Sequence, residues 1–267
     1  MSATMPEMFA MGAAYRRFMD RWSRRLAPLL VEFAGVGRRG RVLDVGTGTG
    51  ALAAAIAGAA PAAYVVGIDR SPGFVSDAAT GSGDRTRFLV GDARQLPLRN
   101  RSFDRTLSML VMNFIPAPSS ALQEMVRVTR PGGIVASAVW DYGEGMEMLR
   151  AFWDEVVRLN PAAASMDERE LPLCRRGELG ALWRQNGLQQ VEEQPLTIQQ
   201  AFDSFDDYWS PFLGRVGPAG AYVASLSEAG RLALESALAT RLTGRRRDVP
   251  IALRARAWAV KGRVPAD

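Results

Sequence analysis

The segment Arg41–Gly50, RVLDVGTGTG, constrains the fold of this chain more than any other. A short apolar strand carrying Asp44 runs into three glycines at alternate positions, Gly46, Gly48 and Gly50, and the helix-forming run ALAAAIA follows. A strand that turns through glycines into a helix lets the backbone approach a ligand closely and aims helix N–H groups at it. The segment therefore favours a site for a nucleotide-like cofactor, with an ordinary strand–helix turn as the alternative.

Strand and helix patterns alternate through the first half of the chain. Apolar strand patterns occupy 42–45, 64–68, 86–90, 103–108 and 134–140, and helical patterns occupy 13–35, 50–59, 72–80 and 118–129. Pro28 is expected to kink or divide the first helix, and RPGG at 130–133 is expected to form a turn. This alternation predicts a parallel sheet with helices on both faces.

The chain after residue 141 is less regular. Helices are expected at 145–159, 176–186 and 227–242, and the strands 188–194 and 251–260 can pair as a late hairpin. Residues 197–247 lie between those two strands and contain an aromatic-rich run, FDSFDDYWSPFLG, at 202–214. An insertion of this length between two sheet strands usually covers something, so we expect it to face a ligand.

Composition excludes several kinds of chemistry. The 267 residues include no histidine, which excludes an imidazole base and histidine metal ligands, and no metal site is expected. Lys261 is the only lysine and lies far from any glycine loop, so a P-loop is excluded. The single cysteine, Cys174, cannot form an internal disulfide, and this favours a reducing compartment.

The net charge of +5 raises the question of a nucleic-acid partner. The arginines are spread along the chain, as solvated surface residues would be, so binding of RNA or DNA is not favoured. No apolar run approaches the ~18–20 residues that cross a bilayer, and the N-terminal residues lack the pattern of a signal peptide. We therefore expect a cytoplasmic protein without a membrane span.

Two further acids follow the next two strands and narrow the type of cofactor. The glycines alone also satisfy the G-x-G-x-x-G/A dinucleotide fingerprint through Gly46, Gly48 and Ala51, so a nicotinamide enzyme is a rival. Asp69 ends the second strand, where an acid accepts hydrogen bonds from both ribose hydroxyls. Asp92 ends the third strand, where an acid can accept from an adenine amino group. Acids at the ends of three successive strands favour an adenosyl cofactor.

The order of these motifs resembles that of the class I S-adenosylmethionine-dependent methyltransferases, in particular the small-molecule, type 11, ubiquinone-biosynthesis-like branch. VLDVGTGTG stands at the family's first motif, GIDRS at its ribose-binding motif and GDARQLPL at its adenine-binding motif. FDRTLSMLVMNFIP and RPGG are similar to the fourth strand and to the turn before the fifth. YRRFMDRWS at 15–23 is similar to an N-terminal helix that closes over the cofactor. The resemblance is strong over residues 12–140.

This resemblance implies an α/β fold: a Rossmann-like, doubly wound sheet of seven strands, mostly parallel with an antiparallel late strand, plus helical lid insertions. It implies a single methyltransferase domain over residues 1–267. Within it, the expected parts are N-terminal cap helices at 1–40, a cofactor-binding core at 41–140, substrate-covering helical segments at 141–187 and 197–247, and final strands at 188–196 and 251–260.

The resemblance also assigns cofactor contacts to individual residues. Asp44 and the glycine backbone are expected to hold the methionine end of S-adenosylmethionine, Asp69 its ribose and Asp92 its adenine. Tyr15 and Trp22 are weaker candidates, for which a place in the core is an equal alternative. The full set of expected cofactor contacts is Tyr15, Trp22, Asp44, Gly46, Thr47, Gly48, Gly50, Asp69, Arg70, Asp92, Ala93 and Ser108, the last through its backbone carbonyl.

The implied reaction is an in-line attack of the acceptor on the sulfonium methyl group, to which the protein contributes mainly proximity and orientation. A base is needed only if the nucleophile holds a proton at working pH. Many family members have a histidine near the position of Asn113, and an asparagine can orient a substrate but cannot take its proton. Asp141, just past the fifth strand, is the best placed carboxylate for a catalytic role, with Tyr142 and Glu144 as alternates.

Segments 141–172 and 197–247 are expected to bind a small-molecule acceptor. Their aromatic face either packs against the domain or, if exposed in a cleft, selects a flat or apolar molecule. Two alternatives stay open: a non-catalytic S-adenosylmethionine-binding regulatory protein, which the missing histidine would suit, and an RNA-directed methyltransferase. The residues of this aromatic face are Phe202, Phe205, Tyr208, Trp209 and Phe212.

Overall fold

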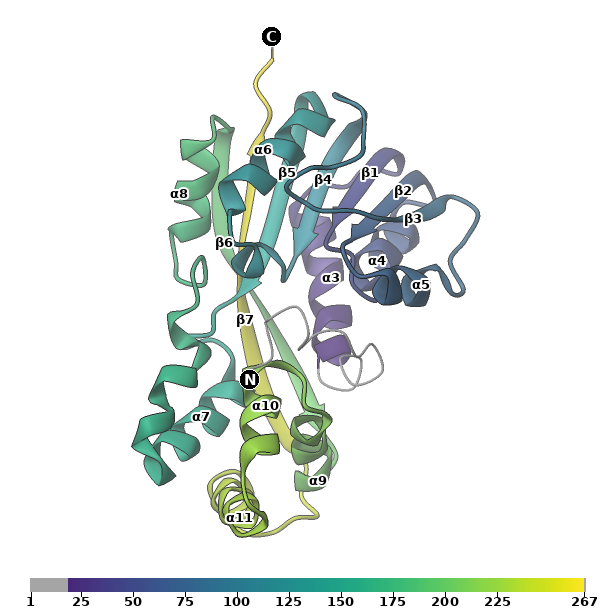
Figure 1. Cartoon of the computed structure of the whole chain (residues 1–267). Coiled ribbons are helices and arrows are strands. Elements are labelled where there is room, and N and C mark those ends of the chain that lie inside the picture. Colours follow the sequence, from purple (N-terminus) through teal and green to yellow (C-terminus); the bar gives the residue numbers. More distant parts are fainter. Residues whose placement is uncertain (1–18, 267) are drawn as a thin grey trace. The chain divides into compact units, whose positions relative to one another are not determined.

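The computed structural model describes residues 19–266, whose contacts divide the chain into two compact units (Figure 1). Within the described residues, unit 1 comprises 19–22, Asp141–Leu171 and Thr197–Arg256, and unit 2 comprises Ser23–Trp140, Pro172–Leu196 and 257–266. A helix long and apolar enough to cross a membrane is absent from residues 19–266.

A seven-stranded sheet forms the centre of unit 2, with the order β3-β2-β1-β4-β5-β7-β6. β1 to β5 run parallel, whereas β7 pairs antiparallel with β5. The strand order reverses between β1 and β4, the switch point at which open α/β sheets bind ligands. The seven strands are β1 (Arg39–Val45), β2 (Ala62–Asp69), β3 (Thr86–Val90), β4 (Phe103–Met109), β5 (Thr129–Trp140), β6 (Gln189–Phe202) and β7 (Ile251–Arg263).

Helices cover both faces of this sheet. Neighbouring residues of a strand face opposite sides. Arg105 Nε donates to the carbonyl of Ala34 after α3, whereas Thr106 hydrogen-bonds Thr129, whose hydroxyl also donates to Met125 O of α6. α3 and α6 therefore lie on opposite faces. The helices of unit 2 are most of α3 (Arg21–Phe33), α4 (Ala51–Ala59), α5 (Pro72–Ala79), the short η2 (Met112–Phe114), α6 (Pro118–Val128) and α8 (Glu178–Gln185).

Unit 1 has an aromatic core. Phe152 and Phe212 stack with ring centroids 4.6 Å apart, and Tyr208 lies 5.4 Å from Phe212 and donates a hydrogen bond to Met148 O. All four side chains are fully buried. The helices around this core are α7 (Glu147–Leu159), η3 (Pro161–Met166), η4 (Glu168–Glu170), α9 (Phe205–Trp209), η5 (Ser210–Gly214), α10 (Gly217–Ser225) and α11 (Glu228–Thr243).

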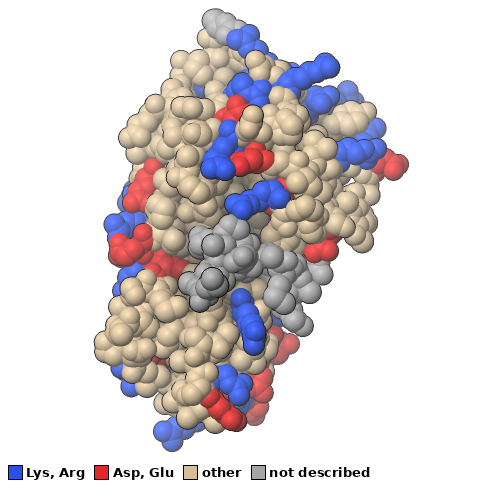
Figure 2. Space-filling model, viewed as in Figure 1, with Lys and Arg blue, Asp and Glu red and all other residues tan. Residues whose placement is uncertain are grey.

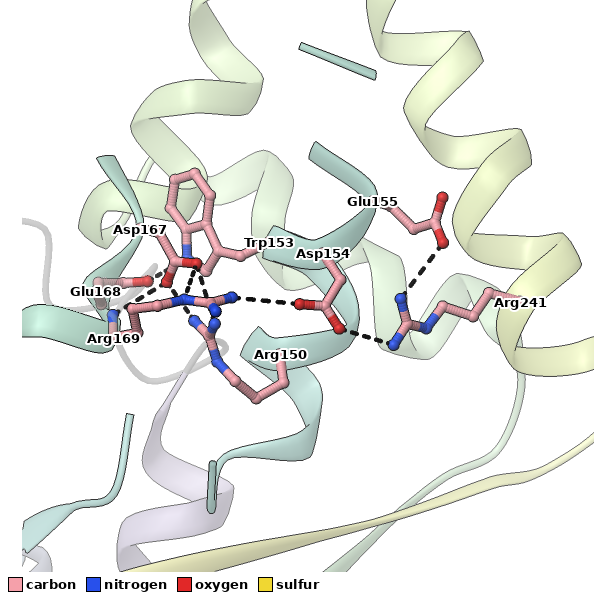
Figure 3. Close-up of polar contacts among 8 residues, drawn as sticks. All are labelled: Arg150, Trp153, Asp154, Glu155, Asp167, Glu168, Arg169 and Arg241. Carbon is pink, nitrogen blue, oxygen red and sulfur yellow. Dashed lines mark hydrogen bonds and ion pairs between the residues drawn. The ribbon is translucent and has the colours of Figure 1, made fainter. Parts of the chain in front are cut away.

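A network of charged side chains joins three of these helices (Figure 3). Arg241 of α11 pairs with Asp154 of α7 at 2.9 Å, and Asp154 pairs with Arg169 of η4 at 3.3 Å. Arg169 and Arg150 of α7 both pair with Asp167. Beside this network the Glu168 carboxylate accepts a hydrogen bond from Trp153 Nε1, and burial raises the pKa of Glu168 to about 7. The network ties η4 to α7 and α7 to α11.

The structure confirms the predicted seven-stranded, doubly wound sheet with its antiparallel late strand. Of the two effects expected of Pro28, a division of the helix is not observed, because α3 continues through Pro28 to Phe33. Pro28 and Arg24, whose carbonyl loses its partner four residues on, both lie on the exposed side of the helix, where water can satisfy that carbonyl. Residues 13–18 of the predicted helix lie outside the described residues.

The sequence predicted that RPGG at 130–133 forms a turn before the strand. In the structure these residues belong to the start of β5. Gly132 adopts φ +73°, and the register with β4 shifts between Phe103↔Thr129 and Arg105↔Ile134. Gly132 N also donates to Val264 O, so pairing with the end of β7 holds this irregular stretch in the sheet. The sequence also missed α10 and the length of β6, which runs to Phe202.

Candidate cofactor site

The acids predicted to bind a cofactor end neighbouring parallel strands. Asp44 of β1 lies in register with Gly67 of β2, and Asp69 is the last residue of β2, beside Val90 of β3. Because parallel strands end at the same edge of a sheet, these side chains lie at the carboxyl edge next to the switch point. The sequence predicted that these acids lie at the ends of successive strands, and the structure places Asp44 and Asp69 there.

The glycine loop after β1 is held against β2 by its backbone. Gly46 N and Thr47 N both donate to Ile68 O, at 2.8 and 2.9 Å. Gly46 adopts φ +74°, and a Cβ there would lie 2.5 Å from Val111 Cγ2, so a side chain is excluded. The N-cap of α4, Gly50, supplies no side-chain hydrogen bond, so the first turn of α4 can receive an anionic group, although its Ala53 N–H already interacts with the Asp44 carboxylate.

Asp44 is the most unusual acid of this edge. Its Oδ2 accepts a hydrogen bond from Thr47 Oγ1 at 2.7 Å, whereas its buried Oδ1 has no hydrogen-bond partner among the described residues. Burial raises the pKa of Asp44 to about 7, with the nearby Asp69 carboxylate acting in the same direction. A buried carboxyl that lacks a cation in this way fits a ligand that brings a positive charge to it.

Asp69 and Asp92 are engaged differently. Asp69 accepts hydrogen bonds from Gly48 N and Ser71 N, both at 2.9 Å, so it joins the glycine loop to α5, and burial raises its pKa. Each oxygen of Asp69 retains a second lone pair for a ribose hydroxyl. The Arg94 guanidinium forms an ion pair with the exposed Asp92, in which Nη2 lies 2.7 Å from Oδ2, and this pairing lowers the pKa of Asp92 to about 2. The sequence did not predict the role of Arg94, although Arg94 follows Asp92 by only two positions and could be expected to pair with it.

Ser108, Ser137 and Asn113 add buried polar atoms to the switch-point side of the sheet. Ser108 of β4 and Ser137 of β5 are register partners, and neither hydroxyl has a hydrogen-bond partner among the described residues. Asn113, in η2 after β4, is 5% exposed, and neither amide atom has a partner within residues 19–266. Buried polar groups are normally paired, so orphaned ones indicate a site for water or ligand.

Two further candidates belong to unit 1. Asp141 Oδ2 accepts from Arg256 Nε and Nη2 at 2.9 and 2.6 Å, and Oδ1 accepts from Glu144 N at 3.0 Å. These contacts favour an anchoring role for Asp141 over proton abstraction. Trp22 is fully buried with its ring 6.0 Å from that of Phe202, which is the core alternative that the sequence left open. Tyr15 lies outside the described residues.

The aromatic face of 202–214 also forms core. Phe202, Phe205, Tyr208 and Phe212 are each fully buried, and Trp209 is 4% exposed. Of the two interpretations of this face, the structure therefore supports packing within unit 1.

Among residues 19–266 there is no group of three or more acidic or cysteine side chains placed to hold a metal ion. Figure 2 shows arginines and acids interspersed over the visible face.

Comparisons with known proteins relate this chain to methyltransferases. Residues 43–137 match the family model of a methyltransferase domain. An uncharacterised protein of Mycobacterium tuberculosis is 27% identical over 219 residues, which cover 79% of this chain and 78% of that protein. A demethylmenaquinone methyltransferase of Thermus thermophilus is 40% identical over 117 residues, which cover 42% of this chain and 51% of that enzyme.

The fold is similar to that of solved methyltransferases. The Haemonchus contortus phosphoethanolamine N-methyltransferase 2, solved in complex with S-adenosyl-L-methionine, superposes with a TM-score of 0.57 at 19% identity. The superposition covers 98% of this chain and 57% of that one. At this identity the likeness concerns the fold alone.

Proposed function

We propose that this chain, which belongs to the S-adenosylmethionine-dependent methyltransferases, transfers a methyl group from that cofactor to a small-molecule acceptor. The observation that carries the proposal is the buried Asp44 carboxyl beside the glycine loop, with Oδ1 unpartnered among the described residues. A strand–helix turn that binds no ligand does not require a buried carboxyl group at this position. A cofactor with an ammonium group would pair with it and favour its ionised form.

The other residues of the carboxyl edge fit the same cofactor. The uncapped first turn of α4 suits a carboxylate, so the methionine end would lie between α4 and Asp44. Asp69 would accept hydrogen bonds from the ribose hydroxyls through its free lone pairs, with Arg70 beside it. Asp92 and the backbone of Ala93 would bind the adenine. Ser108 would contribute its carbonyl near the methionine moiety.

S-Adenosylmethionine, when bound, supplies a methyl group made electrophilic by its sulfonium. The protein then has to align the acceptor and exclude water, since the described residues offer no histidine base. We assign the orienting role to Asn113. Its amide can donate to one acceptor oxygen and accept from one N–H or O–H group at the same time. A group that both donates and accepts, such as a hydroxyl or an amide, satisfies Asn113 better than a carboxylate or an ammonium.

The acceptor is proposed to be a small molecule that carries such a polar group. The demethylmenaquinone methyltransferases among the relatives support a small-molecule acceptor, and they match about half of this chain. Those matches do not assign the residues of this chain that contact the acceptor. Segments 141–172 and 197–247 are the proposed source of those contacts.

An acceptor screen that reads out S-adenosylhomocysteine tests this proposal. With an active acceptor, we expect Asn113→Leu to leave the Kd for S-adenosylhomocysteine within about twofold and to lower kcat/KM by about tenfold or more, because a hydrogen bond is lost to the acceptor alone. Turnover of RNA but of no small molecule would contradict it.

Asp141→Asn separates anchoring from proton abstraction. An anchoring Asp141 predicts turnover within about tenfold of the wild type, because the amide oxygen can still accept from Arg256. A general base predicts a loss of about 10²–10⁴-fold, together with loss of the acidic limb of the pH–rate profile. Arg256→Gln is the matched variant, since it breaks the same ion pair from the other side and leaves the carboxylate in place.

A further inference from the structure

The loop that carries Asp92 lies between β3 and β4, at residues 91–102, and forms neither helix nor regular strand. Its first part is a tight turn in which Gln95 N donates to Asp92 O at 3.0 Å and Arg94 N donates to Asp92 Oδ1 at 2.8 Å. Leu96, the next residue, is buried. Asp92 is therefore held on one side by Gly91, whose N–H donates to Asp69 O at 2.9 Å, and on the other side by the turn that leads to Leu96.

Two side chains of α6 hold this part of the loop. Glu124 Oε2 accepts from Leu96 N at 2.7 Å, and Arg127 Nη2 donates to Leu96 O at 3.0 Å, so both polar backbone groups of Leu96 are bound. Arg127 Nη1 reaches further along the loop to Leu98 O at 2.9 Å and Asn100 Oδ1 at 2.5 Å.

Glu124 and Arg127 also fix each other. Arg127 Nε and Nη2 bind the two oxygens of Glu124 at 2.6 and 2.7 Å, a bidentate pair three residues apart on one helix face. This pairing lowers the pKa of Glu124 and raises that of Arg127. The two side chains are one-fifth to one-third exposed. Neither is among the residues expected to touch a cofactor.

We propose that the Glu124–Arg127 pair positions the loop at residues 91–102. The pair holds Asp92 in place before the ligand binds and thereby sets the selectivity of the site for adenine. This inference rests on the proposed cofactor. A loop held in advance binds the base without first having to be ordered. The pair acts through Leu96 and the turn at 92–95, and not by contact with the ligand.

The test compares two ligands that differ only at the adenine amino group. S-Adenosylhomocysteine has this group, and its purine-riboside analogue carries a hydrogen atom in its place. Calorimetry gives both Kd values for the wild type, for Arg127→Gln and for the isosteric Glu124→Gln. Arg158→Gln is the control, because Arg158 and Glu155 form the same kind of pair three residues apart on α7, in unit 1.

We expect the wild type to prefer S-adenosylhomocysteine by about tenfold or more, the effect of one hydrogen bond to a charged group. In Arg127→Gln the preference should fall to near one, in Glu124→Gln it should fall partly, and in Arg158→Gln it should stay. A merely structural loss would weaken both ligands equally and keep the ratio. Hydrogen exchange of the Leu96 amide should speed up in Arg127→Gln and in Glu124→Gln, and this measurement needs no ligand.

Three outcomes would overturn the inference. One is an unchanged ratio in folded Arg127→Gln and Glu124→Gln. A second is a wild type that binds both ligands equally, which would leave the cofactor proposal intact. The third is a wild type that binds neither ligand, which would remove the cofactor proposal as well. Should Arg127→Gln fail to fold, the ratio and the amide exchange of Glu124→Gln decide alone.

Discussion

Asp44 shows at the scale of one residue how function opposes stability. A carboxyl whose folded-state pKa lies above its unfolded value of 3.8 binds more protons in the folded state, so its contribution to stability decreases as the pH rises from about 4 to its folded pKa of about 7. The shift corresponds to about 4 kcal/mol once the group is ionised. Such a cost is expected where a site waits for a cationic ligand.

Asp44→Asn is therefore expected to stabilise the ligand-free protein at pH 8 by up to about 4 kcal/mol, because the amide carries no buried charge. The same variant should lose affinity for S-adenosylhomocysteine, since the partner of the ammonium group is gone. Urea unfolding at pH 8 and at pH 4 measures the difference, which should be small at pH 4. A variant less stable than the wild type at pH 8 would contradict the assigned burial of this charge.

Gly46 is required by two features of its position. Its φ of +74° disfavours any side chain, and a Cβ would collide with Val111. Gly46→Ala is expected to weaken S-adenosylhomocysteine binding by at least about tenfold, because left-handed strain of about 1–2 kcal/mol adds to the displacement of the loop. Gly81→Ala is the matched control: Gly81 has φ +76° with open space around its Cβ position. Equal binding by Gly46→Ala and the wild type would exclude the loop as the ligand contact.

At the scale of elements, the aromatic core holds unit 1 together. Phe212→Ala removes a fully buried ring stacked on Phe152, and we expect a loss of about 3–5 kcal/mol in the free energy of unfolding. The neighbouring Leu213 is 44% exposed, so Leu213→Ala should change stability by less than about 1 kcal/mol. Thermal and urea unfolding compare the two. Similar losses in both variants would show that the ring does not belong to a core.

Prediction from the sequence worked best where a pattern is local. The glycine loop and the acids ending β1, β2 and β3 are each defined by a few consecutive residues, so strand, turn and acid could be placed together. The pairing of Asp141 with Arg256, 115 positions away, has no local signature and redirected the role expected for Asp141. Burial of the aromatic face was equally hidden, because periodicity predicts that residues share a face but not what covers it.

The Glu124–Arg127 pair could be predicted from the sequence only in part. A spacing of three residues on a helix predicts the ion pair itself. Its binding to Leu96, 28 positions before Glu124, could not be anticipated, because it depends on how the loop after β3 folds back against α6.

At the scale of the whole molecule, buried carboxyls set the dependence of stability on pH. Asp44 and Glu168 both have a pKa raised to about 7 by burial, and burial also raises the pKa of Asp69, so stability should fall as the pH rises from about 4 to 7. Asp92 and Glu124, whose pKa values are lowered by Arg94 and Arg127, act in the opposite sense and lose their contributions only in more acidic solution. Stability should therefore be greatest near pH 4.

Thermal unfolding between pH 3 and pH 9 checks this profile. Asp44→Asn and Glu168→Gln should each flatten the decline above pH 4, and together they should remove most of it, because the sites lie in different units and are expected to act independently. An unchanged decline in the double variant would assign the pH dependence to other groups.

The central claim is that the carboxyl edge of unit 2 binds S-adenosylmethionine through an ionised Asp44. Calorimetric titration with S-adenosylhomocysteine at pH 6, 7 and 8 tests it most directly. The account predicts saturable binding that strengthens by up to about tenfold per pH unit below 7 and levels off above it, because the ammonium group needs the carboxylate. It also predicts that this pH dependence disappears in Asp44→Asn. No binding at millimolar ligand, or binding by Asp44→Asn that matches the wild type, would contradict it.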